Sequence, residues 1–344
     1  MAKVFLTGGT GFIGQPLTQV LLHLGWEVKV LVRNPDALPA RRLVGMGAQC
    51  VQGDILDPES LRAGMAGTDL VVHNAGWYEL GLDSEGEKRM TDINVRGTEN
   101  VLQAALELGI SRTVYVSSVV CWGGTGQEIW DETRSRNTPV SNFYEVTKSE
   151  AHEQALSFQR KGLPLIVVCP SQVIGPNDHS IFGYFLRMYL NRIMPPLIWS
   201  PRVANSFVFV DDLANGIVLA AQKGRLGEVY FLVGDHMEKC HYLKSWTQRP
   251  GGARNWVVLP RWLAKIMFSS MAPLLRRLGF PAFISAETVT GDVNRRFSSA
   301  KAQRELGWTY RSANQMWMET MDQEMAILKQ RKGQNLLQKL KPME

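Results

Sequence analysis

A run of glycines near the N-terminus constrains the fold of this chain more than any other feature. Residues 7–14 read Thr-Gly-Gly-Thr-Gly-Phe-Ile-Gly, directly after an apolar run at 4–6 and before a helix-like stretch at 15–24. A strand, a glycine turn and a helix start in this order predict a β–α unit whose turn cradles a phosphate.

Each glycine has a separate task in such a turn. Gly8 allows the sharp exit from the strand, Gly11 lets the backbone approach a pyrophosphate, and Gly14 lets the helix pack closely on the sheet. The free N–H groups and the positive dipole end of the helix then favour the phosphates. A tight turn without a ligand would show the same glycines, so the motif alone leaves that alternative open.

Apolar runs and helical patterns alternate through the first half of the chain. The apolar runs are nearly continuous in Val, Ile and Leu, which is typical of parallel strands covered on both faces. The alternation predicts an α/β fold of the Rossmann type, with a doubly wound parallel sheet. We expect strands at 4–6, 28–32, 49–52, 70–73, 112–117 and 165–169, and helices at 15–24, 58–65, 94–108 and 143–161.

The alternation stops after about residue 175, which indicates a second unit. We expect a nucleotide-binding domain over 1–175, to which a segment at about 205–235 returns. A smaller C-terminal α/β substrate lobe is expected from 176–204 and 236–325. The remaining residues, 326–344, are expected to form a helical tail with frayed last residues.

Composition and charge exclude several classes of protein. Hydrophobic residues make up 45% and charged residues 20%, which is ordinary for a soluble globular chain. The net charge is +6, and apart from a C-terminal third rich in Arg and Lys the basic residues are scattered. The chain shows no basic stripe and no known module, so we expect no nucleic-acid partner. We expect no signal peptide, and no uncharged apolar run reaches the roughly 18 residues needed to span a bilayer.

The four cysteines, Cys50, Cys121, Cys169 and Cys240, show no Cys-x-x-Cys spacing, and three lie in apolar, strand-like runs. This usage favours buried free thiols in a reducing compartment, and hence a cytoplasmic protein. Residues 236–241 carry two histidines and a cysteine. Their spacing matches no zinc module, so no metal site is predicted.

Tyr144 and Lys148 form a Tyr-x-x-x-Lys pattern inside a predicted helix. Residues four apart share one helix face, so the ammonium can lie near the phenol. A nearby cation favours the phenolate and lowers a tyrosine pKa from its usual value near 10. Such a tyrosine can exchange a proton with an alcohol, although the pattern by itself is common by chance.

Two further segments follow predicted strands, where ligands bind in open α/β sheets. Ser117 and Ser118 end one strand, and a serine there can hydrogen-bond a substrate oxygen or merely satisfy local backbone groups. Residues 169–176 follow another strand, where the backbone can meet a nicotinamide ring.

In chain order, these segments resemble the extended short-chain dehydrogenase/reductases of the NAD-dependent epimerase/dehydratase superfamily. The style is that of the dihydroflavonol reductase-like branch, with 3β-hydroxysteroid dehydrogenases and nucleotide-sugar epimerases as more distant relatives. The matching segments are residues 7–14, 53–55, 72–76, 94–101, 115–118, 144–148, 170–176, 210–212 and 298–302.

The resemblance implies a role for several residues. Ser118 would polarise the substrate oxygen, Tyr144 would be the acid/base, and Lys148 would hold the nicotinamide ribose and lower the tyrosine pKa. Asn94 would order a water near the lysine, unless it only caps a helix start. The residues implied to bind the cofactor are Gly8, Thr10, Gly11, Phe12, Ile13, Gly14, Arg33, Asp54, Ile55, Asn74, Ala75, Gly76, Asn94, Ser117, Tyr144, Lys148, Pro170, Ser171 and Val173.

Arg33 favours NADP(H) over NAD(H) as the cofactor. An NAD enzyme usually has an acidic residue at the end of the second strand, whereas this chain has Arg33, whose guanidinium suits a 2′-phosphate. Asp36 lies three residues later and leaves NAD(H) open. A solvated loop arginine is the other interpretation of Arg33.

The activity that we expect is hydride transfer between NADP(H) and a ketone or secondary alcohol of a small-molecule substrate. Residues 181–200 and 256–283 are rich in aromatic and apolar residues, so the substrate should be bulky and largely apolar, unless these residues are only core. The alternative is a nucleotide-sugar epimerase or dehydratase with tightly bound NAD. A nucleotide-sensing regulator is less favoured, because this chain keeps both the tyrosine and the lysine.

Two expectations concern partners. Residues 256–283 also carry Arg261, Lys265, Arg276 and Arg277, and a basic amphipathic helix can lie on a membrane surface, so peripheral membrane contact is an open alternative. The resemblance implies a monomer or a homodimer, the latter formed through residues 94–108 and 143–161.

Overall fold

The computed structural model describes residues 2–343. Its centre is a seven-stranded parallel sheet in the order β10-β6-β5-β4-β1-β2-β3. This confirms the predicted Rossmann-type α/β fold, and the bounds of the six expected strands differ from the observed ones by at most one residue at either end. The strands are β1 (Lys3–Thr7), β2 (Glu27–Val32), β3 (Gln49–Gln52), β4 (Leu70–His73), β5 (Arg112–Val116), β6 (Leu165–Pro170) and β10 (Val229–Leu232).

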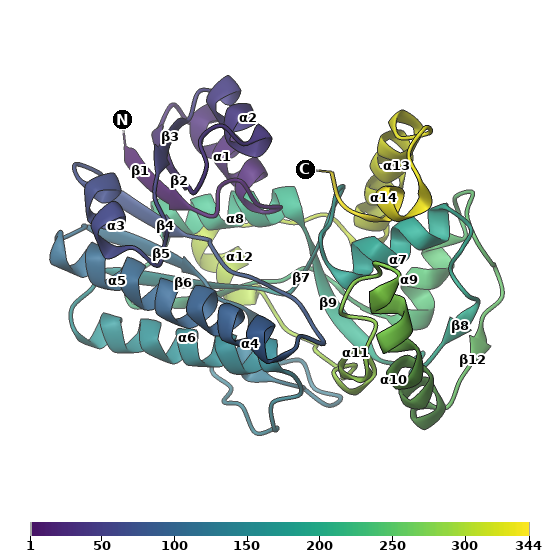
Figure 1. Cartoon of the computed structure of the whole chain (residues 1–344). Helices are drawn as coiled ribbons and strands as arrows, with labels where there is room; N and C mark the ends of the chain where they lie inside the picture. Colours follow the sequence, from purple (N-terminus) through teal and green to yellow (C-terminus); the bar gives the residue numbers. More distant parts are fainter. Residues whose placement is uncertain (1, 344) are drawn as a thin grey trace.

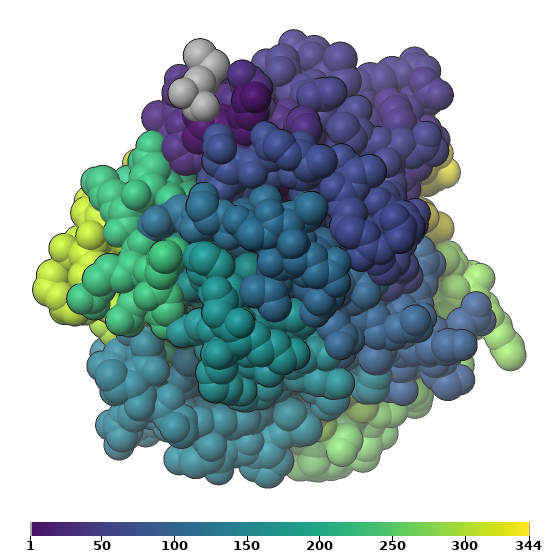
Figure 2. All heavy atoms as spheres, turned by 90° about the vertical axis from the view of Figure 1, so that its left-hand side faces the viewer, coloured from purple at the N-terminus to yellow at the C-terminus, as the bar shows by residue number. Residues whose placement is uncertain are grey.

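Helices cover both faces of the sheet (Figure 1). One face packs against α1 (Gly14–His23), α2 (Leu38–Met46), α8 (Val210–Lys223) and α12 (Ala300–Leu306), and the other against α3 (Pro58–Met65), α5 (Gly97–Glu107) and α6 (Phe143–Arg160). Figure 2 shows that the end of the molecule with α3, α5 and α6 is formed mainly by the first half of the chain.

The two faces explain why the strand runs are apolar throughout. Val4 and Leu6 belong to one core and Phe5 to the other, and all three are fully buried. Alternate side chains of a strand point to opposite faces, so a sheet covered on both sides needs apolar residues at every position.

The order of strands places a crevice beside β1. The chain runs from β1 to β2 and β3 on one side and then returns to β4 on the other side of β1. Thr7 at the end of β1 hydrogen-bonds His73 at the end of β4, with 2.7 Å between Oγ1 and Nδ1. Ligands in open α/β sheets bind where the strand order reverses in this way.

The remaining strands and helices form a second, smaller region beside the seven-stranded sheet (Figure 1). A three-stranded sheet has the order β11-β9-β7, and β8 pairs with β12. The strands are β7 (Gln172–Ile174), β8 (Leu197–Ile198), β9 (Ala204–Phe209), β11 (His236–Glu238) and β12 (Val257–Val258), and the helices are α7 (Ile181–Leu190), α9 (Lys239–Trp246), α10 (Arg261–Arg277), α11 (Ala286–Thr290), α13 (Ala313–Gln330) and α14 (Leu336–Leu340).

Two helices of the first half have no counterpart in the sequence analysis. These are α2 and α4 (Ser84–Thr91), and α4 buries only Met90. A nearly all-polar helix lacks the apolar periodicity on which such a prediction rests. Helix α4 then continues through a π-helical turn at Asp92–Arg96 into α5, so the expected helix at 94–108 is the end of a longer one.

The expectation that the last residues fray is wrong for residues up to 343, and Glu344 lies outside the described residues. Leu340 is fully buried, and its carbonyl accepts a hydrogen bond of 2.7 Å from Nε of Arg187. Asn177 Nδ2 donates to the carbonyl of Met343 at 2.9 Å. The buried guanidinium of Arg187 also pairs with Glu324 at 3.1 Å, because a charge removed from water needs partners.

Replacing Arg187 should therefore destabilise the fold. Arg187→Met leaves the buried Glu324 carboxylate without its counter-charge, and we expect the free energy of unfolding to fall by about 3 kcal/mol or more. Urea unfolding measures this, with Lys329→Met, an exposed site on the same helix as Glu324, as the matched control. Equal stability of the two variants would contradict the role of Arg187.

Candidate active site

One cavity of about 950 Å³ opens at the carboxyl ends of β1, β4, β5 and β6 and extends into the second, smaller region, between residues of α7, α9 and α10. Of the predicted site residues, only Gly14 and Asn94 do not line it. The residues that do are Gly8, Thr10, Gly11, Phe12, Ile13, Arg33, Asp54, Ile55, Asn74, Ala75, Gly76, Ser117, Ser118, Tyr144, Lys148, Pro170, Ser171 and Val173.

The glycines of the turn differ in what requires them. Gly8 has a φ of +71°, and a Cβ there would lie 2.7 Å from the amide nitrogen of Ala75. A Cβ on Gly14 would lie 2.0 Å from the carbonyl oxygen of Gly8. A Cβ on Gly11, by contrast, would have no neighbour nearer than 3.4 Å. Packing within the chain requires Gly8 and Gly14, whereas the absence of a side chain at Gly11 keeps space open in the cavity.

Six residues of the cavity wall carry a buried polar side-chain atom that has no hydrogen-bond partner among residues 2–343, namely Asn74, Ser171, Gln172, Trp199, Trp246 and Arg295. Two of these atoms, Oδ1 of Asn74 and Oγ of Ser171, lie directly after β4 and β6, beside the crevice. Buried polar groups are nearly always paired, so these atoms indicate a bound molecule with polar groups of its own. The open space at Gly11 and these two atoms fit a dinucleotide laid across the crevice.

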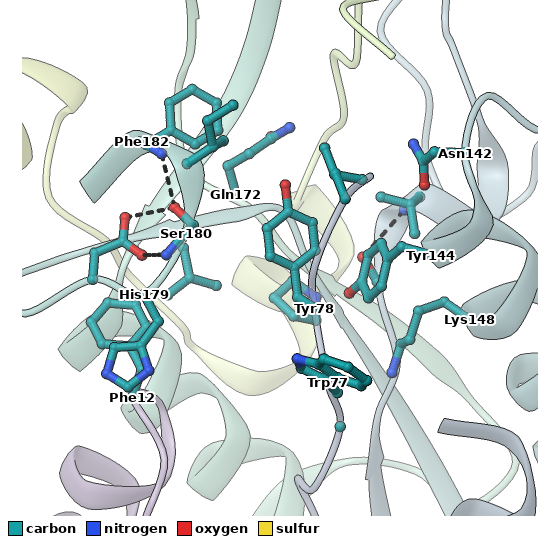
Figure 3. Close-up of a pocket in the computed structure, with 18 of the residues that line it drawn as sticks. Phe12, Trp77, Tyr78, Asn142, Tyr144, Lys148, Gln172, His179, Ser180 and Phe182 are labelled. Atoms are coloured by element: carbon teal, nitrogen blue, oxygen red, sulfur yellow. Dashed lines mark hydrogen bonds between the residues drawn. The ribbon is translucent and has the colours of Figure 1, made fainter. Parts of the chain in front are cut away.

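Tyr144 and Lys148 come from the first turns of α6 and face the end of β5. The helix starts after Asn142, whose Oδ1 accepts a 3.0 Å hydrogen bond from the amide of Glu145. Lys148 Nζ donates to the carbonyl of Val116 at 3.2 Å and to the hydroxyl of Tyr115 at 3.3 Å. Figure 3 shows the Tyr144 ring between Tyr78 and Lys148.

The pKa of Tyr144 is not lowered as the sequence analysis expected. Burial raises it to about 12, although the charge of Lys148 and a hydrogen bond with Ser118 both act to lower it. The ring of Tyr78 meets it edge-on at 4.8 Å and adds to the burial. In the protein alone, desolvation thus outweighs the lysine.

The two serines at the end of β5 have different surroundings. The hydroxyl of Ser117 hydrogen-bonds Nδ1 of His152 at 2.9 Å. Burial, assisted by Lys148, lowers the pKa of His152 to about 4, so this histidine is neutral near pH 7. Ser118 lies beside Tyr144, and its Oγ accepts a 3.3 Å hydrogen bond from the amide of Val120. Ser118 is therefore the serine hydroxyl next to the phenol.

Asn94 lies outside the cavity lining, hydrogen-bonds residues next to it, and is not a helix-start cap. It lies in the π-helical turn within the continuous helix from α4 to α5. Its Oδ1 accepts from the amide of Trp77 at 2.7 Å, and its Nδ2 donates to the Trp77 carbonyl at 2.9 Å and to Thr147 at 3.1 Å. The side chain thus ties the loop that carries Trp77 and Tyr78 to helix α6.

Glu145, which lies between Tyr144 and Lys148 in the chain, was not among the predicted site residues. Its buried carboxylate pairs with Arg136 at 2.7 Å and with Arg295, and it accepts a 3.0 Å hydrogen bond from the amide of Ser141. Burial would raise its pKa, but Arg295, Ser141 and Arg136 outweigh burial and lower it. No local motif marks Arg295, which lies 150 residues away in sequence.

A polar group on the opposite wall was also not predicted. Asp178 accepts hydrogen bonds from the amide and the hydroxyl of Ser180 at 2.7 and 2.8 Å, yet burial raises its pKa to about 6. The ring of His179 stacks on Phe12 at 6.0 Å (Figure 3). The break in the β–α alternation after about residue 175 was the available signal.

The far part of the cavity is apolar and aromatic. It is formed by side chains of α7, α9 and α10 and of the loop after β8, namely Phe182, Phe185, Met188, Trp199, Trp246, Met267 and Phe268. The aromatic residues expected at 181–200 and 256–283 therefore supply both a pocket wall and part of the core.

No metal site was predicted from the four cysteines or from the histidines at residues 236–241. All four cysteines are free, and only Cys169 is fully buried, so the expectation of several buried thiols holds for one of them. The structure does bring donor atoms of Glu238, Cys240 and His241 within 4.8 Å of one another. Lys244 and Arg296 line the same hollow, and their positive charges oppose a cation there.

The fold and the crevice define a nucleotide-binding enzyme, and comparison with known proteins gives its family. The family model described as NAD dependent epimerase/dehydratase matches residues 4–234, so the chain belongs to that family. It is an NAD(P)-dependent enzyme of the extended short-chain dehydrogenase/reductase type.

Several relatives match over nearly the whole chain. The chain is 29% identical over 337 residues to 4-hydroxy-2-methyl-3-oxo-4-farnesyl-3,4-dihydroquinoline-1-oxide ketoreductase of Stigmatella aurantiaca, covering 93% of this chain and 96% of that protein. It is 31% identical over 329 residues to a dihydroflavonol 4-reductase-like protein of Synechocystis sp., with 90% and 91% covered. The crystal structure of gox2253 is similar with a TM-score of 0.79 and 28% identity, with 95% and 99% covered.

We expect Glu145→Gln to destabilise the protein at neutral pH by about 3 kcal/mol, because the buried Arg295 and the partly buried Arg136 lose their counter-charge. The lowered pKa of Glu145 fixes the pH dependence. The advantage of the wild type should be complete above about pH 4.5, the usual value, and should shrink as the pH falls towards the lowered pKa.

Urea unfolding of both proteins at a series of pH values tests this, with the exposed Glu150→Gln on the same helix as the control. A difference that grew below pH 4.5 would contradict the ion pairs.

Proposed function

We propose that the protein is an NADP(H)-dependent oxidoreductase that interconverts a ketone and a secondary alcohol on a bulky, largely apolar substrate. One observation carries the proposal. Tyr144, Ser118 and Lys148 meet at the end of β5, where the polar crevice beside the glycine turn joins the apolar part of the cavity.

The residues that would hold the cofactor follow from the crevice. The glycine turn and the start of α1 would take the pyrophosphate, and Asp54 and Ile55 would lie at the adenine end. The unpaired side-chain oxygens of Asn74 and Ser171 would form hydrogen bonds with polar groups of the bound molecule. The nicotinamide supplies or accepts a hydride when bound, and its oxidised ring carries a positive charge.

Ser118 and Tyr144 would act on the substrate oxygen from the protein side. In ketone reduction, the Ser118 hydroxyl donates a hydrogen bond to the carbonyl oxygen, and Tyr144 gives its proton to the oxygen as the alcohol forms. A phenol with a pKa near 12 is fully protonated at neutral pH and is ready to donate. Lys148, fixed on Val116, keeps a positive charge near the phenolate that remains.

The choice of NADP(H) rests on Arg33. Its exposed guanidinium lines the cavity at the end of β2 and has no ion-pair partner within residues 2–343. Asp36, the acid that would favour NAD(H), does not line the cavity, and it lies 3.9 Å from Arg41. A free cation at this place suits a 2′-phosphate.

The apolar wall supports an apolar substrate over a sugar nucleotide. A nucleotide diphosphate needs free cations or backbone donors, whereas Lys239 and Arg295 in this part of the cavity are already paired with Asp292 and Glu145. The similar ketoreductase of Stigmatella aurantiaca is named for a farnesyl-bearing substrate, which is likewise bulky and apolar. We also propose a cytoplasmic location, which the four free cysteines support.

Removing the phenol hydroxyl tests the mechanism. Tyr144→Phe should lower kcat for ketone reduction by a factor of about 100 or more, because the proton donor is lost, and should leave NADPH affinity nearly unchanged. The assay follows NADPH absorbance over a screen of apolar ketones. Tyr310→Phe, which lies outside the cavity, is the matched control. Substantial activity in Tyr144→Phe would disprove the assigned role.

Replacing Arg33 tests the cofactor preference. Arg33→Ser should weaken NADPH binding by about 10- to 100-fold, the effect of one charge-assisted hydrogen-bonded pair, and should leave NADH binding unchanged. Fluorescence titration of both nucleotides measures this, and Arg41→Ser on α2 is the control. NAD that copurifies and does not exchange would instead support the epimerase or dehydratase alternative.

A further inference from the structure

Helix α10 presents a continuous apolar stripe to solvent. Trp262, Ile266, Leu274 and Leu278 lie on one helix face, at spacings of four or eight residues, and are 65%, 57%, 61% and 55% exposed. Leu263 and Met271 widen the stripe, and Val257 and Val258, just before the helix, are each 57% exposed. We call these eight residues the α10 surface. So many large apolar side chains together on a surface mark an interaction site.

The inner side of the same helix has a different task. Ala264 is fully buried against Trp199 and Val289, and the ring of Phe268 meets that of Trp199 edge-on at 5.0 Å. Met267 and Phe268 line the apolar part of the active-site cavity. Figure 1 shows α10 at the edge of the molecule beside α11, so one helix separates the cavity from the α10 surface.

The charges around this surface have one sign. From residue 239 to residue 286 the chain contains no Asp or Glu, although it contains eight Lys and Arg residues. Arg254, Lys265, Arg276 and Arg277 are exposed and make no ion pair within residues 2–343. One carboxyl close to Arg276 is Glu79, which is half-buried and whose pKa is raised by burial, although Arg276 acts to lower it.

We infer that α10 docks the protein on an anionic lipid bilayer, with the α10 surface inserted among the acyl chains and the surrounding cations at the lipid head groups. An apolar stripe flanked by Lys and Arg lies in the plane of the membrane interface, and each basic residue adds attraction to anionic lipid. A protein partner for this surface would need an apolar patch surrounded by acidic residues. An anionic bilayer combines the same two properties, because negatively charged head groups border its apolar interior. No helix within residues 2–343 is long and apolar enough to cross a membrane.

The docking gives the cavity a source of substrate, and this part of the inference rests on the proposed function. An apolar ketone partitions into the bilayer, and the cavity wall formed by Met267 and Phe268 is on the helix that contacts it. Substrate would then pass from the membrane to Tyr144 with little exposure to water.

Vesicle sedimentation tests the docking directly. Wild-type protein should bind vesicles of phosphatidylcholine with one third phosphatidylglycerol about tenfold or more tightly than vesicles of phosphatidylcholine alone. Trp262→Ser/Ile266→Ser/Leu274→Ser should weaken this binding about tenfold or more. Lys265→Gln/Arg277→Gln should weaken binding to the anionic vesicles only, by about fivefold per charge.

The matched control replaces three equally exposed apolar residues elsewhere on the surface, Ile129→Ser/Val44→Ser/Leu226→Ser, and should bind as the wild type does. Unchanged thermal unfolding and NADPH affinity of each variant show that the fold is intact. No binding of the wild type to anionic vesicles, or equal binding to both kinds, would overturn the inference. So would a wild-type dimer in analytical ultracentrifugation that the triple serine variant converts to a monomer without any vesicle binding.

Turnover separates the docking from the proposed function. The triple serine variant should reduce a short, water-soluble ketone at the wild-type rate and a vesicle-bound apolar ketone more slowly. If no ketone is reduced, the proposed function fails while the sedimentation result still decides the docking. If both ketones are reduced at the wild-type rate, the membrane does not deliver the substrate.

Discussion

The close approach of the first helix to the first strand sets the geometry on which the site depends. A Cβ on Gly14 would fall 2.0 Å from the carbonyl of Gly8, so α1 can start only where that side chain is missing. The glycine turn, at Gly8, also packs against the backbone of Asn74 and Ala75, just after the end of β4. The crevice beside β1 thus has walls fixed by backbone contacts, and of the four glycines of the turn only Gly11 has no neighbour close to the place of a Cβ.

Buried charges fix the other wall. Glu145 joins α6 to the loop at Arg136 and to Arg295, which pairs through its backbone with Ala204 and Ser206 of β9. Glu145, near the start of α6, is therefore fixed by ion pairs to two segments that lie far apart in the sequence. A buried carboxylate between two arginines is costly to form, but its hydrogen bonds have direction, which apolar packing lacks. This rigidity suits a helix whose neighbouring residue is the proton donor that we propose.

The sequence could predict whatever depends on local pattern. The strands, the glycine turn and the cavity residues at strand ends follow from apolar runs and from the rule that ligands bind at carboxyl ends. It could not predict Glu145 with Arg295, or Leu340 with Arg187, because these pairs join segments that only the tertiary fold brings together. It also misjudged the pKa of Tyr144, since residue spacing shows the nearby lysine but not the degree of burial.

The same limit explains why α10 was ambiguous in sequence. Its apolar residues are numerous enough to cover a full turn, so pocket, core and membrane surface were all open. The structure divides them: Ala264, Met267 and Phe268 face the protein, whereas Trp262, Ile266 and Leu274 face solvent. Leaving three large apolar side chains in water is unfavourable, and the basic residues beside them would add nothing to folding. Two apolar environments, the cavity on one side and the lipid on the other, explain why both faces of α10 carry large apolar side chains.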